Sequence, residues 1–202
     1  MDTYWNHNVA YHKWLLSQVK GRNAVLDVGC GDGFLIQKIS KVCDKAIGID
    51  IHAPSIQRAK QRLNNTENAS TIEVRFEDFN GEPGSFDAII FVASLHHMNL
   101  EFGIRKAIEL LKPNGKLLIV GLARPHNIFD KIIEIARILP VKFGDLFHNV
   151  QGDIGAPIMD EKESLEDIRN IAKKYLPNVK IRQALYHRYL LTWVKPNKYE
   201  PT

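Results

Sequence analysis

The sequence predicts a single α/β domain in which a mostly parallel sheet is covered by helices on both faces. Three stretches of β-branched and aliphatic residues, at 24–28, 45–51 and 86–94, lack the alternation of a half-exposed strand, as expected of parallel strands buried on both faces. The first leads into a turn with a glycine at every second position, followed by an apolar helical repeat from residue 34. With 202 residues, 45% of them hydrophobic, the chain is long enough for one such domain with a sizeable core.

The glycine turn differs from the dinucleotide-binding fingerprint in spacing and in charge. Counted from Gly29, the third glycine of that fingerprint would fall on Phe34. Asp27 precedes the turn and Asp32 lies within it, and two carboxylates would repel a pyrophosphate. The turn therefore suits a ligand that carries a cationic group and no phosphate, as S-adenosylmethionine does with its ammonium and sulfonium.

A further carboxylate, Asp50, ends the next apolar stretch. It lies about 20 residues beyond the turn, where doubly wound folds place an acid that accepts hydrogen bonds from ribose hydroxyls. Together, residues 25–33 and 48–50 resemble the first two motifs of the class I S-adenosylmethionine-dependent methyltransferases, and the resemblance extends over residues 22–122. It implies a Rossmann-like three-layer sandwich whose seven-stranded, mostly parallel sheet has an antiparallel C-terminal strand. It also implies S-adenosyl-L-methionine as cofactor and S-adenosyl-L-homocysteine as product.

The same resemblance assigns the cofactor site to the ends of the first four strands. After a strand expected at 71–76, Asp78 and Phe79 match the position that contacts the adenine, although a turn-forming role for Asp78 is an alternative. The residues expected to bind the cofactor are Asp27, Gly29, Cys30, Gly31, Gly33, Asp50, Ile51, Asp78, Phe79, Ala93 and Ser94.

The remaining segments continue the alternation of helices and strands. Apolar residues at helical spacing predict helices at 34–41, 55–63, 100–111, 129–139 and 164–175. Apolar or alternating stretches predict strands at 117–120, 179–185 and 189–194. The last two strands fit the antiparallel ending of the sheet.

Two less regular regions are expected to contact the methyl acceptor, within one domain that spans residues 1–202. Residues 1–20 are predicted to form amphipathic helices rich in aromatic residues and histidine, either a lid over the site or helices that simply pack on the sheet. Residues 124–157 interrupt the alternation after the fifth strand, where small-molecule methyltransferases vary their substrate caps. The candidate substrate residues are Tyr4, Tyr11 and His148.

His96 and His97 are the leading candidates for a general base, which the reaction needs only if the acceptor atom is protonated. They follow the fourth strand, beside the expected methyl group, and histidine titrates in a suitable range. The alternative is that one histidine shapes the loop while the other faces solvent. His12, on the expected lid, is a third candidate. The eight histidines lack metal-ligand spacing, so no metal is expected.

The composition bears on partners and location. The net charge is +4, but lysine and arginine are scattered and no basic arm is present, so nucleic acid is not an expected partner. No stretch approaches the ~20 apolar residues that cross a membrane, and the first residues lack a secretory signal. A cytoplasmic location is expected, with Cys30 and Cys43 as reduced thiols. Nothing in the sequence indicates an oligomeric state.

The favoured function is transfer of a methyl group, by in-line displacement, to an O, N or C nucleophile of a small metabolite. The residues that follow the fourth strand lack the Asn/Asp-Pro-Pro-Tyr/Phe motif of methyltransferases that act on the amino groups of adenine or glutamine. The chain is similar to the small-molecule branch that includes ubiquinone and menaquinone biosynthesis enzymes. Two alternatives stay open: an RNA- or protein-modifying methyltransferase, and a non-catalytic S-adenosylmethionine-binding partner protein.

Overall fold

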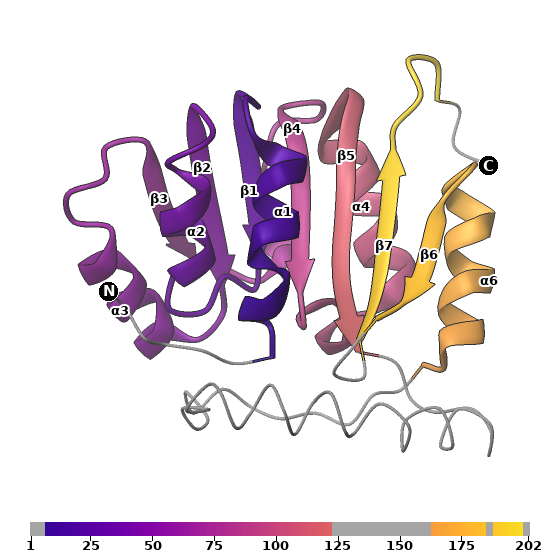
Figure 1. Ribbon diagram of the computed structural model, residues 1–202, viewed down its shortest axis with the longest axis horizontal. Coiled ribbons are helices and arrows are strands. Elements are labelled where there is room, and N and C mark those ends of the chain that lie inside the picture. Colours follow the sequence, from indigo (N-terminus) through magenta and orange to yellow (C-terminus); the bar gives the residue numbers. More distant parts are fainter. Residues whose placement is uncertain (1–6, 123–162, 185–187, 200–202) are drawn as a thin grey trace.

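A computed structural model describes residues 7–122, 163–184 and 188–199 of the chain (Figure 1). Seven strands form one sheet in the order β3-β2-β1-β4-β5-β7-β6. Neighbours from β3 to β5 are parallel, whereas β7 is antiparallel to both β5 and β6. The predicted fold class is therefore confirmed. In chain order the strands are β1 (Ala24–Val28), β2 (Lys45–Asp50), β3 (Ala69–Glu73), β4 (Phe86–Val92), β5 (Leu111–Leu122), β6 (Lys180–Gln183) and β7 (Arg188–Val194).

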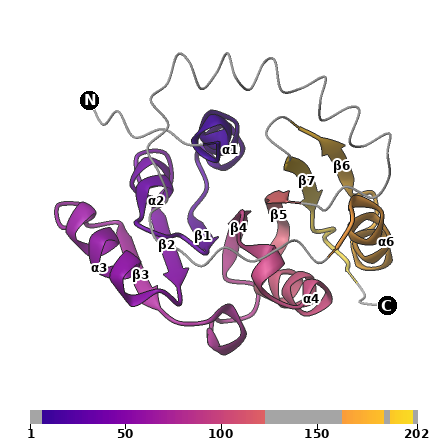
Figure 2. The same ribbon diagram turned by 90° about the horizontal axis from the view of Figure 1, so that it is seen from below.

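The helices cover the two faces of the sheet (Figure 2). One face packs against α1, α2 and α3, and the other packs against α4 and α6. These helices are α1 (His12–Val19), α2 (Phe34–Ile39), α3 (Ala53–Arg62), α4 (Leu100–Leu110) and α6 (Leu165–Tyr175). The three layers follow from the sequence, because strands that are apolar on both faces must be covered on both faces.

Successive residues of each central strand contribute to opposite cores. In β1, Val25 packs among residues of α1, α2 and α3, whereas Leu26 packs among residues of α4 and α6. Ile89 and Ile90 of β4 divide in the same way. All four side chains have no exposed surface. The two-residue period of a strand thus explains why apolar residues occupy successive positions in these strands instead of alternating with polar ones.

The third strand differs from its predicted bounds. It ends at Glu73, and the chain then forms a 3-10 turn, η2 (Phe76–Asp78). The turn directs Phe76 into the core, where its ring meets the ring of Phe91 edge-on at 5.4 Å.

Several expectations lie outside the described residues. These are the helix at 129–139, the insertion at 124–157, Tyr4 and His148, together with the first part of the expected lid. Within the described ranges, no helix combines the length and the apolar character needed to span a membrane.

Candidate functional site

The parallel strands end at one edge of the sheet, the lower edge in Figure 1. The register pairs Val28 at the end of β1 with Ile49 in β2 on one side and Phe91 in β4 on the other. The loops that follow β1, β2 and β4 therefore begin side by side. Ligands of doubly wound folds bind at this edge, where neighbouring connections diverge to opposite faces.

The turn after β1 is held close to the strands beside it. The backbone amides of Gly29 and Cys30 donate to the carbonyl oxygen of Ile49, at 2.8 and 3.0 Å. Gly29 has a φ of +78°, and a Cβ at this position would lie 2.4 Å from the Cβ of Ser94. The Ser94 hydroxyl in turn donates to the carbonyl oxygen of Val28. Only glycine satisfies both the backbone conformation and this close approach.

Asp50 connects the end of β2 to the glycine turn. Its Oδ2 accepts a hydrogen bond from the Gly31 amide and its Oδ1 accepts one from the His52 amide, both at 2.9 Å. Two backbone donors thus fix the carboxylate, and each oxygen retains capacity for another donor. The next residue, Ile51, leaves 63% of its surface exposed. A fixed carboxylate beside an exposed apolar side chain is suited to a ribose and an adjoining base.

Asp27, the residue before the last in β1, carries a buried carboxyl group. It is 2% exposed, and its Oδ1 has no hydrogen-bond partner among the described residues. Burial, and to a smaller extent the nearby charge of Asp50, raises the pKa of this carboxyl to about 7. A positively charged ligand would favour the ionised form and offset its desolvation. These residues fit a ligand that combines a cationic group with a ribose, as S-adenosylmethionine does.

Asp32, the other acid of the glycine turn, already has a cationic partner. Its Oδ2 lies 3.1 Å from Nη2 of Arg62, and its carbonyl oxygen accepts from Nε of the same guanidinium. The sequence argument counted both acids as counter-charges for the ligand. Because α3 supplies a cation to Asp32, Asp27 is the acid of this turn that carries that argument.

The pair expected to contact the adenine divides between surface and core. The Asp78 carboxyl is 69% exposed and lies 4.0 Å from Nε of Arg75. Phe79 is 9% exposed, and its ring packs against that of Phe86 at 6.3 Å. Asp78 is therefore accessible to a ligand, whereas Phe79 is held in the core by its side chain.

The loop after β4 brings two histidines to the same edge. Ala93 has a φ of +50°, and the 3-10 turn η3 (Leu95–His97) follows. The rings of His96 and His97 are 4.0 Å apart. Burial lowers the pKa of His96 to about 4, with smaller contributions from His97 and Arg188. Burial also lowers the pKa of His97, which Asp50 partly opposes. Both imidazoles are therefore predominantly neutral at pH 7.

His12 and Tyr11 are buried where α1 packs on α2. Nδ1 of His12 accepts a hydrogen bond from Nζ of Lys38 at 3.2 Å, and its ring lies 5.6 Å from that of Phe34. Burial, followed by the charge of Lys38, lowers the His12 pKa to about 3. Tyr11 is 9% exposed and belongs to the same core. These contacts favour a packing role for both side chains, next to the helix that begins at the glycine turn.

The structure also brings together two polar residues, Arg188 and Asn8, that the sequence analysis did not single out. Nη2 and Nε of Arg188 donate to Oδ1 of Asn8 at 2.8 and 3.2 Å. The two residues are 180 positions apart, so no local pattern could have linked them.

Within the described parts of the chain, no group of three or more His, Cys, Asp or Glu side chains is placed to hold a metal ion.

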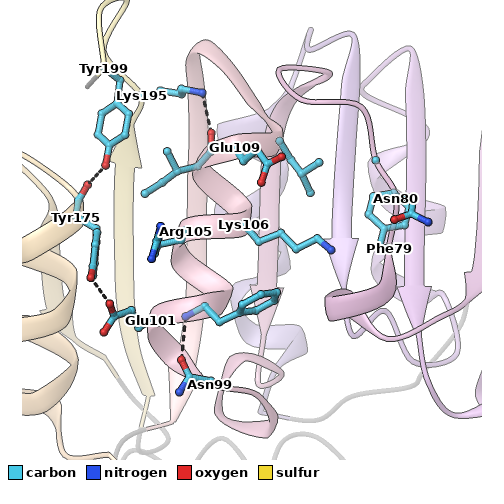
Figure 3. Close-up of a pocket in the computed structure, with 14 residues that line it drawn as sticks. Phe79, Asn80, Asn99, Glu101, Arg105, Lys106, Glu109, Tyr175, Lys195 and Tyr199 are labelled. Atoms are coloured by element: carbon cyan, nitrogen blue, oxygen red, sulfur yellow. Dashed lines mark hydrogen bonds between the residues drawn. The ribbon is translucent and has the colours of Figure 1, made fainter. Parts of the chain in front are cut away.

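A groove of about 960 Å³ follows α4 on the opposite face of the sheet from α1. Figure 3 shows Tyr175 of α6 on one side of it and Phe79 on the other. The Tyr199 hydroxyl donates to the Tyr175 carbonyl at 2.6 Å, and the Tyr175 hydroxyl donates to Glu101. Of the residues expected to bind the cofactor, only Phe79 lines this groove, so it is separate from the site built around Asp27 and Asp50.

Comparisons with known proteins agree with this geometry. Residues 25–115 match a family described as a methyltransferase domain. An uncharacterised methyltransferase of Mycobacterium tuberculosis is 29% identical over 205 residues, which cover 97% of this chain and 100% of that protein. A ubiquinone biosynthesis O-methyltransferase of Xanthomonas campestris is 35% identical over 125 residues, which cover 57% of this chain and 52% of that protein.

Solved structures share the fold at low sequence identity. A protein of Pyrococcus horikoshii aligns with a TM-score of 0.66 at 19% identity, covering 97% of this chain and 94% of that one. The N-methyltransferase NodS of Bradyrhizobium japonicum, in complex with S-adenosyl-L-homocysteine, aligns with a TM-score of 0.62 at 20% identity, covering 95% and 89%. These similarities agree with the strand order and with the acids found at the ends of β1 and β2. Residues 25–115 therefore resemble a methyltransferase domain, and the described fold is the one that solved methyltransferase structures share.

Proposed function

We propose that the protein transfers a methyl group from S-adenosylmethionine to an O, N or C nucleophile of a small metabolite. The observation that carries the proposal is the pair of acids at adjacent strand ends: a buried Asp27 with an unpartnered oxygen and an Asp50 fixed by two amides. A small acceptor is supported by the name of one relative, a ubiquinone biosynthesis O-methyltransferase. The cytoplasmic location remains a prediction from the sequence.

The expected cofactor residues other than Phe79, whose side chain is held in the core, have the following roles in this proposal. Asp50 accepts from the ribose hydroxyls, and Asp27 faces the cationic end of the ligand. The backbone of the glycine turn lies against the ligand, whose adenine contacts Ile51 and the Asp78 carboxyl. Ala93 and Ser94 border the side on which the acceptor binds.

The chain has little covalent chemistry to perform. When bound, the cofactor supplies a methyl group that its sulfonium already activates. The protein must hold the acceptor atom in line with that methyl and exclude water. We infer that residues 1–20 and 124–157 cover the acceptor. For the N-terminal segment, the contact of Asn8 with Arg188 at this edge of the sheet supports the inference.

A proton must leave the acceptor if it reacts from a protonated form. His97 and His96 are the candidates to accept it, since both are predominantly neutral at pH 7. Replacing His97 with Ala should lower the transfer rate by about a hundredfold while cofactor binding is unchanged. Retained turnover in both His97→Ala and His96→Ala would instead indicate catalysis by positioning alone.

The function is tested by transfer of an isotope-labelled methyl group in cell extracts fractionated by size. The purified protein is first titrated with S-adenosyl-L-homocysteine in a calorimeter to establish binding. We expect label in compounds that pass an ultrafiltration membrane. Label retained in RNA or protein would contradict the small-molecule acceptor, and binding without transfer to any fraction would indicate a non-catalytic partner protein.

A further inference from the structure

Arg188 lies at the ligand-binding edge because β7 is antiparallel to its neighbours. The first residue of β7 is therefore at the edge where the parallel strands end. Arg188 is this first residue, and it pairs with Leu122 at the carboxyl end of β5. Val120, two residues earlier in β5, pairs with Val92 at the end of β4. The guanidinium therefore belongs to the same edge as the loop that carries His96, and in the sheet only β5 lies between β4 and β7.

The charge of Arg188 is held in place. Its Nη2 and Nε both donate to Oδ1 of Asn8, and it makes further interactions besides. A guanidinium has five N–H groups, and here two of them share one neutral oxygen. The side chain is half-buried. A fixed, partly desolvated guanidinium is well suited to bind a planar anion through paired hydrogen bonds.

His96 offers a second polar group at the same place. Its Nδ1 is buried and has no hydrogen-bond partner among the described residues. The charge of Arg188 is close enough to contribute to the lowered pKa of this imidazole. A buried ring nitrogen without a partner is expected to bind a water molecule or a ligand atom.

We propose that Arg188 and Nδ1 of His96 bind a carboxylate of the methyl acceptor, so that the substrates are small organic acids. This rests on the proposed function. The alternative source of a carboxylate is the amino-acid part of the cofactor itself. Three strand spacings of about 4.8 Å separate β1 from β7, or about 14 Å. Because Asp27 anchors the cationic end of the cofactor at β1, this distance favours the acceptor.

The test uses benzoate and benzamide, which have similar shapes and differ in charge. Dissociation constants are measured by NMR titration of the protein saturated with S-adenosyl-L-homocysteine, for the wild type, Arg188→Gln and Arg182→Gln. Arg182 is a matched control because it is an exposed arginine on the neighbouring strand β6. Benzoate should bind the wild type and Arg182→Gln at least tenfold more tightly than benzamide, and Arg188→Gln should lose this preference.

A second readout reports on the site directly. Benzoate should raise the pKa of His96 in the wild type, because an anion stabilises the imidazolium, and should leave it unchanged in Arg188→Gln. Arg188→Lys keeps the charge without the paired donors, so a reduced preference for benzoate is expected. This variant also serves as the test if Arg188→Gln does not fold.

The contrary outcomes are distinct. Equal binding of the two probes, no binding of either, or a preference retained in Arg188→Gln would overturn the proposal. If Arg188→Gln weakens S-adenosyl-L-homocysteine but not methylthioadenosine, which lacks the amino-acid carboxylate, Arg188 binds the cofactor and the proposal is wrong. Should S-adenosyl-L-homocysteine fail to bind the wild type, the proposed function fails, and titration of the unliganded protein still tests the carboxylate site.

Discussion

The two halves of the ligand-binding edge differ in charge and in how the sequence builds them. The half at β1 and β2 carries Asp27 and Asp50, which lie 23 positions apart on neighbouring strands. The half at β4 and β7 carries His96, Arg188 and Asn8, the last two 180 positions apart. One half suits a cation and the other an anion. The difference shows that residues close together in the sequence can build one half of this edge, while the other half depends on contacts between distant segments.

The acidic half also differs in how its charges are balanced. Arg62 neutralises Asp32, and two backbone amides stabilise Asp50. Asp27 has no such partner for its Oδ1 among the described residues. We therefore expect the acidic half to be less stable without its ligand than its surroundings. Asp27→Asn tests this expectation, and three other substitutions test the roles of Gly29, Asp50 and Asp32 in the same half.

The largest effect is expected for Gly29→Ala. A Cβ would lie 2.4 Å from that of Ser94 and would force a side chain into a left-handed conformation. We expect a loss of about 3 kcal/mol in the free energy of unfolding. Gly84→Ala is the control, because Gly84 has a φ of +64° with nothing within 4 Å, and should lose only about 1 kcal/mol. Equal losses in urea denaturation would show that the contact with Ser94 has no energetic importance.

Asp50→Ala should have the next largest effect, on cofactor binding. The ribose hydroxyls would lose a charged acceptor, and the amides of Gly31 and His52 would lose their partner. Affinity for S-adenosyl-L-homocysteine should fall by about a hundredfold, measured by calorimetry. Unchanged affinity would refute the role assigned to this acid.

Asp27→Asn should stabilise the protein without its ligand. Because the carboxyl pKa rises from 3.8 to about 7 on folding, the folded state retains a proton that the unfolded chain releases between these values. This carboxyl therefore reduces stability progressively as the pH rises from 3.8 to 7, and has no such effect at lower pH. The substitution should add about 2 kcal/mol at pH 8 and little at pH 4, while weakening cofactor binding.

Asp87→Asn is the control for the sign of that effect. Burial alone would raise the pKa of Asp87, but hydrogen bonds from Lys112 and the Ala24 amide outweigh it and lower the pKa. Its carboxylate therefore stabilises the fold above its unfolded pKa, and that contribution is lost as the pH falls through the folded pKa. Asp87→Asn should destabilise the protein at pH 8. The measurement is thermal unfolding of both variants at both pH values. If the two substitutions changed the unfolding temperature at pH 8 in the same direction, this account of the two acids would be wrong.

The smallest effect is expected for Asp32→Asn. Its partner Arg62 forms an ion pair in which the two side chains are 14% and 22% exposed. Such a pair contributes about 1 kcal/mol or less, and the charge is already neutralised. Affinity for S-adenosyl-L-homocysteine should change by less than about threefold. A loss as large as that of Asp50→Ala would mean that Asp32 contacts the ligand after all.

The strand and the glycine turn of the acidic half form where the sequence predicted them, because their determinants are local. The apolar run of β1, the acid within it and the glycines that follow are adjacent in the chain, and the strand and turn form where they were expected. The prediction was less complete where a side chain's neighbours mattered. Asp32 was taken for a counter-charge because Arg62, 30 positions away, could not be paired with it from the sequence.

The sequence by itself determined the fold class, the order of strand and helix and the chemistry expected at the ends of β1 and β2. Only the tertiary structure decided which acids have cationic partners, that His12 packs against Lys38, and that Arg188 meets Asn8 beside the loop of His96. The physical reason is range. Backbone conformation and hydrophobic periodicity depend on neighbours in the chain, whereas charge pairing and desolvation depend on whatever the fold brings within a few ångströms.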